Sequence, residues 1–100
     1  MSADNAAVQR IGVLRGRVEA IDASIIRLIA QRVALAREIG REKAAAGLPT
    51  LDPAREVEIV SRIMVEAKEA QLDAETVRDI AWRIIGLSRR AQQDQRQPIS

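Results

Sequence analysis

The chain has 100 residues, no Cys and no His, a hydrophobic fraction of 47% and a formal net charge of +2. Without Cys and His, disulfides, thiol and imidazole chemistry and the commonest zinc sites are excluded. The small net charge and the single aromatic residue, Trp82, argue against nucleic acid as a partner. Charged residues interrupt the apolar stretches, so we expect no membrane span and a cytoplasmic protein with a single domain over residues 1–100.

A first helix is predicted from about residue 6 to residue 46, after a short frayed N-terminus. Its apolar residues recur at intervals of three and four, the spacing of a helix face that packs on another helix. They are Ile11, Leu14, Val18, Ile21, Ile25, Leu28, Leu35 and Ile39. Such a helix is roughly 60 Å long, whereas a compact chain of this size has a radius of gyration of about 13 Å. One chain cannot cover that face, which predicts a homodimer with the long helices packed together.

Two shorter helices are predicted after a linker. Residues 47–53 include a glycine and two prolines, which end the first helix. The pair Asp52–Pro53 is typical of an N-cap and a first helical residue, so a second helix is expected over about 53–70. A third is expected over about 74–93, capped by Asp73, before a frayed C-terminus. With no strand pattern in the sequence, the predicted fold is all-α, with three helices per chain.

Arg32 interrupts the apolar face of the first helix. A guanidinium stays charged, so burying it requires an anion nearby. Lys43 lies eleven residues further on, close to three helical turns, and therefore projects from nearly the same side. Two cations on an inward face predict a site for an anionic ligand. Taken separately, Arg32 could instead fix the register of paired helices, and Lys43 could complement the helix dipole.

Further polar residues lie at or beside the apolar faces, and each also has an ordinary structural interpretation. Glu56 could be a first-turn acid, and Ser88 and Gln92 could be solvated or locally bonded side chains. Arg15 is about 25 Å from Arg32 and about 100° round the helix, so both cannot line one compact site from the same chain. In a dimer, Arg15 could reach the site of the partner. As a set, these residues indicate a pocket for a small polyanion that bears a hydroxyl or an ether.

From about Leu14 to Gln92, the chain resembles the all-helical class of chorismate mutases. The motifs that carry the resemblance are Leu14-Arg15, Ile21-Asp22, Gln31-Arg32, Gly40 with Lys43, Asp52-Pro53-Ala54-Arg55-Glu56, and Ile84-Ile85 with Ser88 and Gln92. The resemblance implies an intertwined three-helix homodimer with two active sites, each completed by an arginine from the other chain. It also implies the rearrangement of chorismate to prephenate, in aromatic amino-acid biosynthesis, without a metal or other cofactor.

For the carboxylates of the substrate, the resemblance implies cationic partners from both chains. Arg32 would bind a substrate carboxylate, Ser88 would assist a carboxylate, and Arg15 would be the arginine that the partner chain donates. The expected ligand is accordingly a small dicarboxylate, chorismate.

For the reacting bond and the ring, the resemblance implies hydrogen-bonding partners. Lys43 and Gln92 would bind the ether oxygen, where negative charge grows as its bond to carbon breaks. With Arg32, they are the expected catalytic residues. The Glu56 carboxylate and the backbone of Asp52 would hold the ring hydroxyl.

Two other functions are compatible with the sequence. An isochorismate pyruvate-lyase has the same fold and similar cations, but family members with that activity generally lack an acid at the position of Glu56. A helical dimerisation or adaptor module would use the charges only to set pairing. That second function predicts that Arg32 contacts a protein carboxylate in the empty protein.

Overall fold

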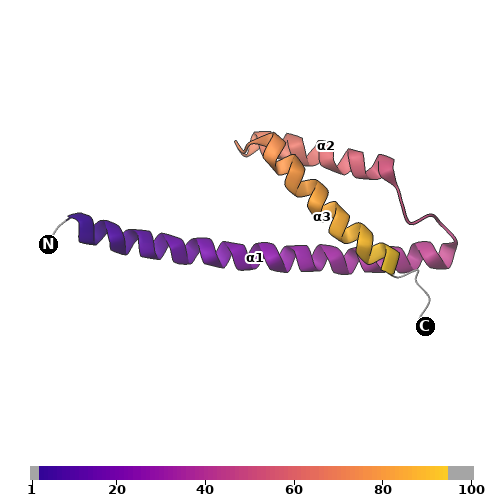
Figure 1. The fold of residues 1–100 in the computed structure, drawn as a ribbon, viewed down its shortest axis with the longest axis horizontal. Coiled ribbons are helices and arrows are strands. Elements are labelled where there is room, and N and C mark those ends of the chain that lie inside the picture. Colours follow the sequence, from indigo (N-terminus) through magenta and orange to yellow (C-terminus); the bar gives the residue numbers. More distant parts are fainter. Residues whose placement is uncertain (1–2, 95–100) are drawn as a thin grey trace. The chain divides into compact units, whose positions relative to one another are not determined.

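The computed structural model describes residues 3–94, which form three α-helices and no strand (Figure 1). The helices are α1 (Ala3–Ala46), α2 (Pro53–Glu69) and α3 (Ala74–Asp94). This confirms the prediction of an all-helical fold with three helices per chain. Of the termini expected to fray, residues 1–2 and 95–100 lie outside the described residues, whereas residues 3–5 and 94 are helical.

The helices begin and end close to the positions that their capping residues indicate. α1 begins about three residues before its expected start, where Asp4 in the first turn complements the positive end of the helix dipole. At α2, the Asp52 carboxylate accepts a hydrogen bond from the Arg55 backbone N–H, and Pro53 is the first helical residue. α2 ends one residue earlier than expected, because Ala70 is its C-cap.

Gly47 ends α1 in a left-handed conformation, with φ of +69°. Its N–H donates to the Ala44 carbonyl at 3.3 Å, and the Leu48 N–H donates to the Lys43 carbonyl at 2.8 Å. This pair of bonds is the Schellman motif, which satisfies carbonyl groups left unpaired at a helix end. The helix therefore stops one turn after Lys43 and leaves that side chain beside the linker.

The chain divides into two compact units, residues 1–31 and residues 32–100. The first unit is the N-terminal part of α1, a single helix with no second element to form a core. Its apolar face is 45–62% exposed and consists of Ile11, Leu14, Val18, Ile21, Ile25 and Leu28. We refer to these six residues as the apolar stripe.

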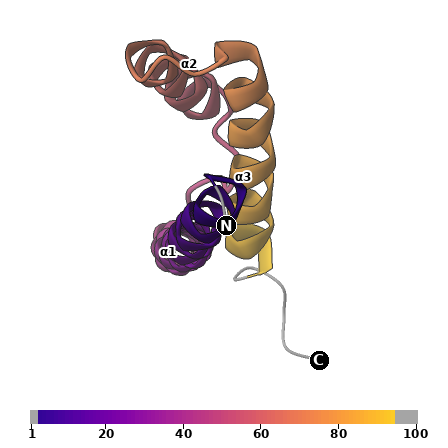
Figure 2. The same ribbon diagram turned by 90° about the vertical axis from the view of Figure 1, so that its left-hand side faces the viewer.

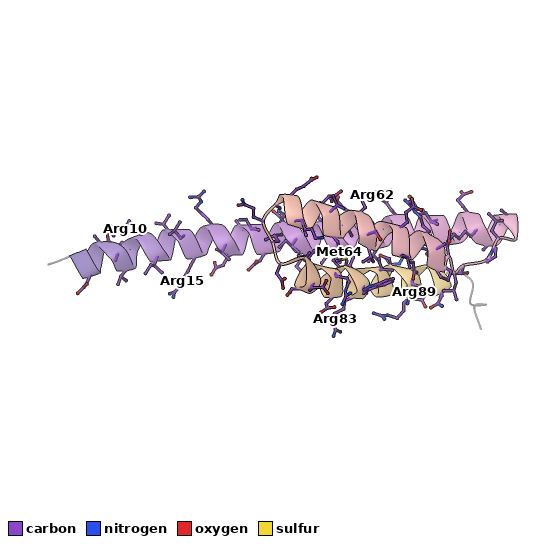
Figure 3. The ribbon with its side chains drawn as sticks, turned by 90° about the horizontal axis from the view of Figure 1, so that it is seen from above. Arg10, Arg15, Arg62, Met64, Arg83 and Arg89 are labelled. Carbon is purple, nitrogen blue, oxygen red and sulfur yellow. The ribbon has the colours of Figure 1, made fainter. Side chains whose placement is uncertain are left out.

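The second unit contains the C-terminal part of α1, the linker, α2 and α3. α2 and α3 are joined by a short turn, and α3 runs from that turn to the C-terminal part of α1 (Figures 1 and 2). The core between α2 and α3 consists of Val60, Ala81 and Ile85. Met64, labelled in Figure 3, packs against it. Since a buried Val or Ile contributes about 1.5–3 kcal/mol and an alanine much less, this is a small core.

Over residues 3–94, no helix is both long and apolar enough to cross a bilayer.

Candidate active site

A cavity of about 460 Å³ lies in the second unit, a size that suits a small molecule. Its polar and charged lining residues are Arg32, Lys43, Thr50, Asp52, Arg55, Glu56, Ser88, Arg89 and Gln92. Six of the seven residues predicted from the sequence are in this group. The seventh, Arg15, belongs to the first unit, where its exposed side chain projects from α1 (Figure 3).

Arg32, on α1, is oriented by a hydroxyl group on α3. Its Nη1 donates to Ser88 Oγ at 2.5 Å, and Ser88 is buried, with 4% of its surface exposed. Within residues 3–94, Arg32 donates to this hydroxyl and forms no ion pair. A guanidinium has five N–H donors, so most of them remain for an anionic ligand.

Lys43 is held from two sides. Its Nζ donates to the Thr50 carbonyl oxygen in the linker at 2.9 Å and to Gln92 Oε1 on α3 at 3.0 Å. An ammonium group has three N–H donors, so one of them remains for a ligand. Because Gln92 accepts through its oxygen, its amide N–H groups also remain as donors. Two neighbouring donors in fixed positions are the arrangement that stabilises negative charge on a ligand oxygen.

Glu56, on α2, pairs with Arg89, on α3. Arg89 Nε donates to Glu56 Oε2 at 2.9 Å, and Nη2 donates to Oε1 at 2.6 Å, which makes the pair bidentate. The hydrogen bonds from Arg89 to Glu56, together with the carboxylate charge, raise the pKa of Arg89 above its ordinary value. Glu56 is therefore a fixed acceptor at the wall of the cavity.

Asp52 lines the cavity as the N-cap of α2. Its carboxylate accepts from the Arg55 N–H at 3.2 Å, and its carbonyl accepts from the Glu56 N–H at 3.1 Å. These two bonds fix the Asp52 backbone next to the Glu56 side chain.

Three further polar or charged residues that line the cavity had no predicted role. Arg55 lies inside the motif that ends at Glu56, and this position is the signal that could have indicated it. Arg89 is the residue after Ser88 and therefore lies about 100° round the helix from it. Helical phase alone would not place Arg89 on the inward face. Thr50 binds Lys43 through a backbone carbonyl, which no side-chain pattern reveals.

The chain is similar to chorismate mutases over most of its length. The family chorismate mutase type II matches residues 14–93. A chorismate mutase of Methanocaldococcus jannaschii is 35% identical over 66 residues, which are 66% of this chain and 67% of that protein. The T-protein of Haemophilus influenzae is 31% identical over 72 residues, 72% of this chain and 19% of that protein.

A bifunctional chorismate mutase/prephenate dehydratase of Aquifex aeolicus is 39% identical over 62 residues, 62% of this chain and 17% of that protein. The chain thus matches two thirds of the archaeal protein and less than a fifth of the T-protein and of the bifunctional protein. The family match includes Arg15 and all the residues that line the cavity. The chain belongs to the chorismate mutase type II family.

Proposed function

We propose that the protein is a chorismate mutase, an isomerase that converts chorismate to prephenate in aromatic amino-acid biosynthesis. The observation that carries this proposal is the pair formed by Lys43 and Gln92, whose polar atoms lie 3.0 Å apart in the wall of the cavity. Both side chains keep donors that are free to bind one ligand oxygen.

The proposed reaction is an intramolecular Claisen rearrangement, which breaks an ether C–O bond and forms a C–C bond. It needs no nucleophile, proton transfer or cofactor. The protein must hold a dianion in a folded conformer and stabilise the charge that grows on the ether oxygen. Lys43 and Gln92 are assigned to that oxygen. Lys43 is already held by the Thr50 carbonyl, and Lys43 and Gln92 are already hydrogen-bonded to each other. Little reorganisation is therefore needed as the charge develops.

The remaining residues of the cavity are assigned to the charged and hydroxyl groups of the substrate. Arg32 binds a carboxylate through N–H groups that its contact with Ser88 leaves unused, and the Ser88 hydroxyl donates to the same carboxylate. The Glu56 carboxylate accepts from the ring hydroxyl, and the backbone N–H of Asp52 donates to it.

The proposed active form is an intertwined homodimer in which Arg15 of one chain completes the site of the other. Its support is the exposed apolar stripe, because a single helix is stable in water mainly when such a face is packed. The small core of the second unit also supports a homodimer, because a partner chain would bury further apolar surface. We also predict that residues 1–100 form one domain and that the protein is cytoplasmic.

The test of the function is the incubation of purified protein with chorismate and, separately, with isochorismate. We expect chorismate to be consumed and prephenate to appear. Pyruvate release from isochorismate without turnover of chorismate would instead identify a lyase. Turnover of neither compound would favour a dimerisation module. The Lys43→Ala protein, purified in the same way, controls for a mutase carried over from the expression host.

A further inference from the structure

The ion pair between Arg89 and Glu56 differs in position from other ion pairs of the chain. It joins α2 to α3, and its side chains are only 34% and 20% exposed. The ion pairs of Arg55, Arg62 and Arg78 instead join neighbours on one helix, and their side chains are 45–73% exposed. Exposed pairs of that kind contribute little to stability, whereas a shielded bidentate pair fixes the geometry of both groups.

The bidentate contact restricts the Glu56 carboxylate without using all of its acceptor positions. A carboxylate offers about four lone-pair sites, and Arg89 takes one on each oxygen. Each oxygen can therefore accept a further hydrogen bond from a ligand hydroxyl. The direction of that bond is set by the plane in which Arg89 holds the carboxylate.

Arg89 also changes the charge of the cavity wall. The charged lining residues are four cations and two carboxylates: Arg32, Lys43, Arg55, Arg89, Asp52 and Glu56. The net charge of these lining residues is +2, with Arg55 also paired to Glu58 outside the cavity, and a positive wall favours a ligand with carboxylates. Without Arg89, the negative charge of Glu56 would have no direct counter-ion beside a dianionic ligand.

We propose that Arg89 is a positioning residue, which holds the Glu56 carboxylate so that it selects a substrate with a ring hydroxyl. The proposal rests on the proposed function and extends it to the preference among related substrates. Arg89 acts through Glu56 and does not itself contact the reacting bond.

The test compares chorismate with an analogue that lacks the ring hydroxyl. The measured quantity is the ratio of kcat/KM for chorismate to kcat/KM for the analogue, in wild type, Arg89→Met and Arg89→Lys. We expect wild type to prefer chorismate and Arg89→Met to lower the ratio by about tenfold, the loss typical of a hydrogen bond to a charged group. Arg89→Lys keeps the charge but not the fork, so its ratio should be intermediate.

A double-mutant cycle shows whether Arg89 acts through Glu56. In Glu56→Ala, the ratio should already be low, and adding Arg89→Met should not lower it further. Arg83→Met is the matched control, because Arg83 lies on the exposed side of the same helix, outside the cavity (Figure 3). Its ratio should equal that of wild type.

Several results would overturn the proposal. One is an equal loss of kcat/KM for both substrates in Arg89→Met, which would mean that Arg89 binds a substrate carboxylate or only supports the fold. A second is an unchanged ratio in both Arg89 variants, and a third is a further drop in the Glu56→Ala background. Should Arg89→Met not fold by circular dichroism, Arg89→Lys decides between the same outcomes. Failure of the proposed function itself is recognised separately, because wild type would then not convert chorismate.

Discussion

The two units of the chain use one helical pattern in two different ways. In the first unit, apolar side chains follow one another at every turn of α1 from Ile11 to Leu28 and remain exposed. In residues 32–46, Arg32 and Lys43 occupy the inward side of the same helix, and groups of other elements hold both side chains. We therefore interpret the continuous stripe as the proposed interface and the cation that interrupts it as part of the proposed binding site.

The largest effect is expected at Lys43. In the proposed mechanism, Lys43→Ala removes a donor from the ether oxygen, where charge appears only near the transition state, so kcat should fall by about two to three orders of magnitude. Arg32→Ala should mainly raise KM, because the carboxylate proposed as its partner is charged in the ground state as well. Steady-state kinetics measures both values. A Lys43→Ala protein with kcat near wild type and only weaker binding would refute the electrostatic mechanism.

The control for these two variants is Lys68→Ala. Lys68 is an exposed cation in the last turn of α2, outside the cavity. Its removal should leave both kinetic constants close to those of wild type.

Mixing two inactive variants tests whether Arg15 of one chain reaches the site of the other chain in a dimer. If Arg15 completes the partner's site, a heterodimer of Arg15→Ala and Lys43→Ala chains contains one site with both residues intact. Random exchange of subunits should then restore roughly a quarter of wild-type activity. Mass spectrometry of the mixture verifies exchange. Exchange without recovery would show that Arg15 acts in the site of its own chain, and an Arg15→Ala protein that is active by itself would show that Arg15 is not needed.

The apolar stripe can be tested by a charge in its centre. Val18→Lys removes about 1.5–3 kcal/mol of apolar burial and adds a cation to the proposed interface, so the dimer should be lost. Sedimentation at micromolar concentration should give about twice the 11.0 kDa chain mass for wild type and less than that for the variant. Glu19→Lys, a larger charge change at the next residue, should remain a dimer. Dimers of equal stability in both variants would contradict an interface at the stripe.

The helices could be predicted because their signals are local. The apolar residues recur at each helical turn, Asp52 and Pro53 start α2, and a glycine follows residue 46. Each of these signals involves residues that are close in the sequence. Two of the four cations that line the cavity were also predictable, since Arg32 breaks the local pattern and Lys43 lies about three turns further on the same side of the helix. The contact of Arg89 with Glu56 was not, because it depends on how α2 and α3 cross. The same holds for the Thr50 carbonyl, which the linker brings to Lys43.

Replacing glycine by alanine should change the stability in opposite directions at Gly47 and at Gly12. Gly47→Ala places a side chain at φ of +69°, which should lower stability by about 1–2 kcal/mol. Gly12→Ala lies inside α1, where an added Cβ meets no atom within 4 Å, so stability should rise by about 0.5–1 kcal/mol. Urea unfolding at a fixed protein concentration measures both changes. Destabilisation by Gly12→Ala would show that a partner chain packs closely at that position.

The smallest expected effect concerns the start of α3 and depends on pH. A hydrogen bond from the Thr76 hydroxyl, together with the backbone N–H groups of Thr76 and Glu75, lowers the pKa of Asp73 below its usual value of 3.8. A lowered pKa means that the ionised form stabilises the folded state. This contribution is fully present above the unfolded-state pKa, and it is lost as the pH falls through the lower, folded-state value.

Asp73→Asn keeps a hydrogen-bond acceptor but has no carboxylate to titrate. We therefore expect wild type to be slightly more stable than Asp73→Asn at pH 7, and the difference should shrink below about pH 4. Unfolding in urea at a series of pH values measures the difference. Thr76→Val, which removes the hydroxyl donor, should reduce this pH dependence while leaving the carboxylate in place. A difference between wild type and Asp73→Asn that stays constant from pH 7 to pH 3 would show that the Asp73 charge contributes nothing to this helix start.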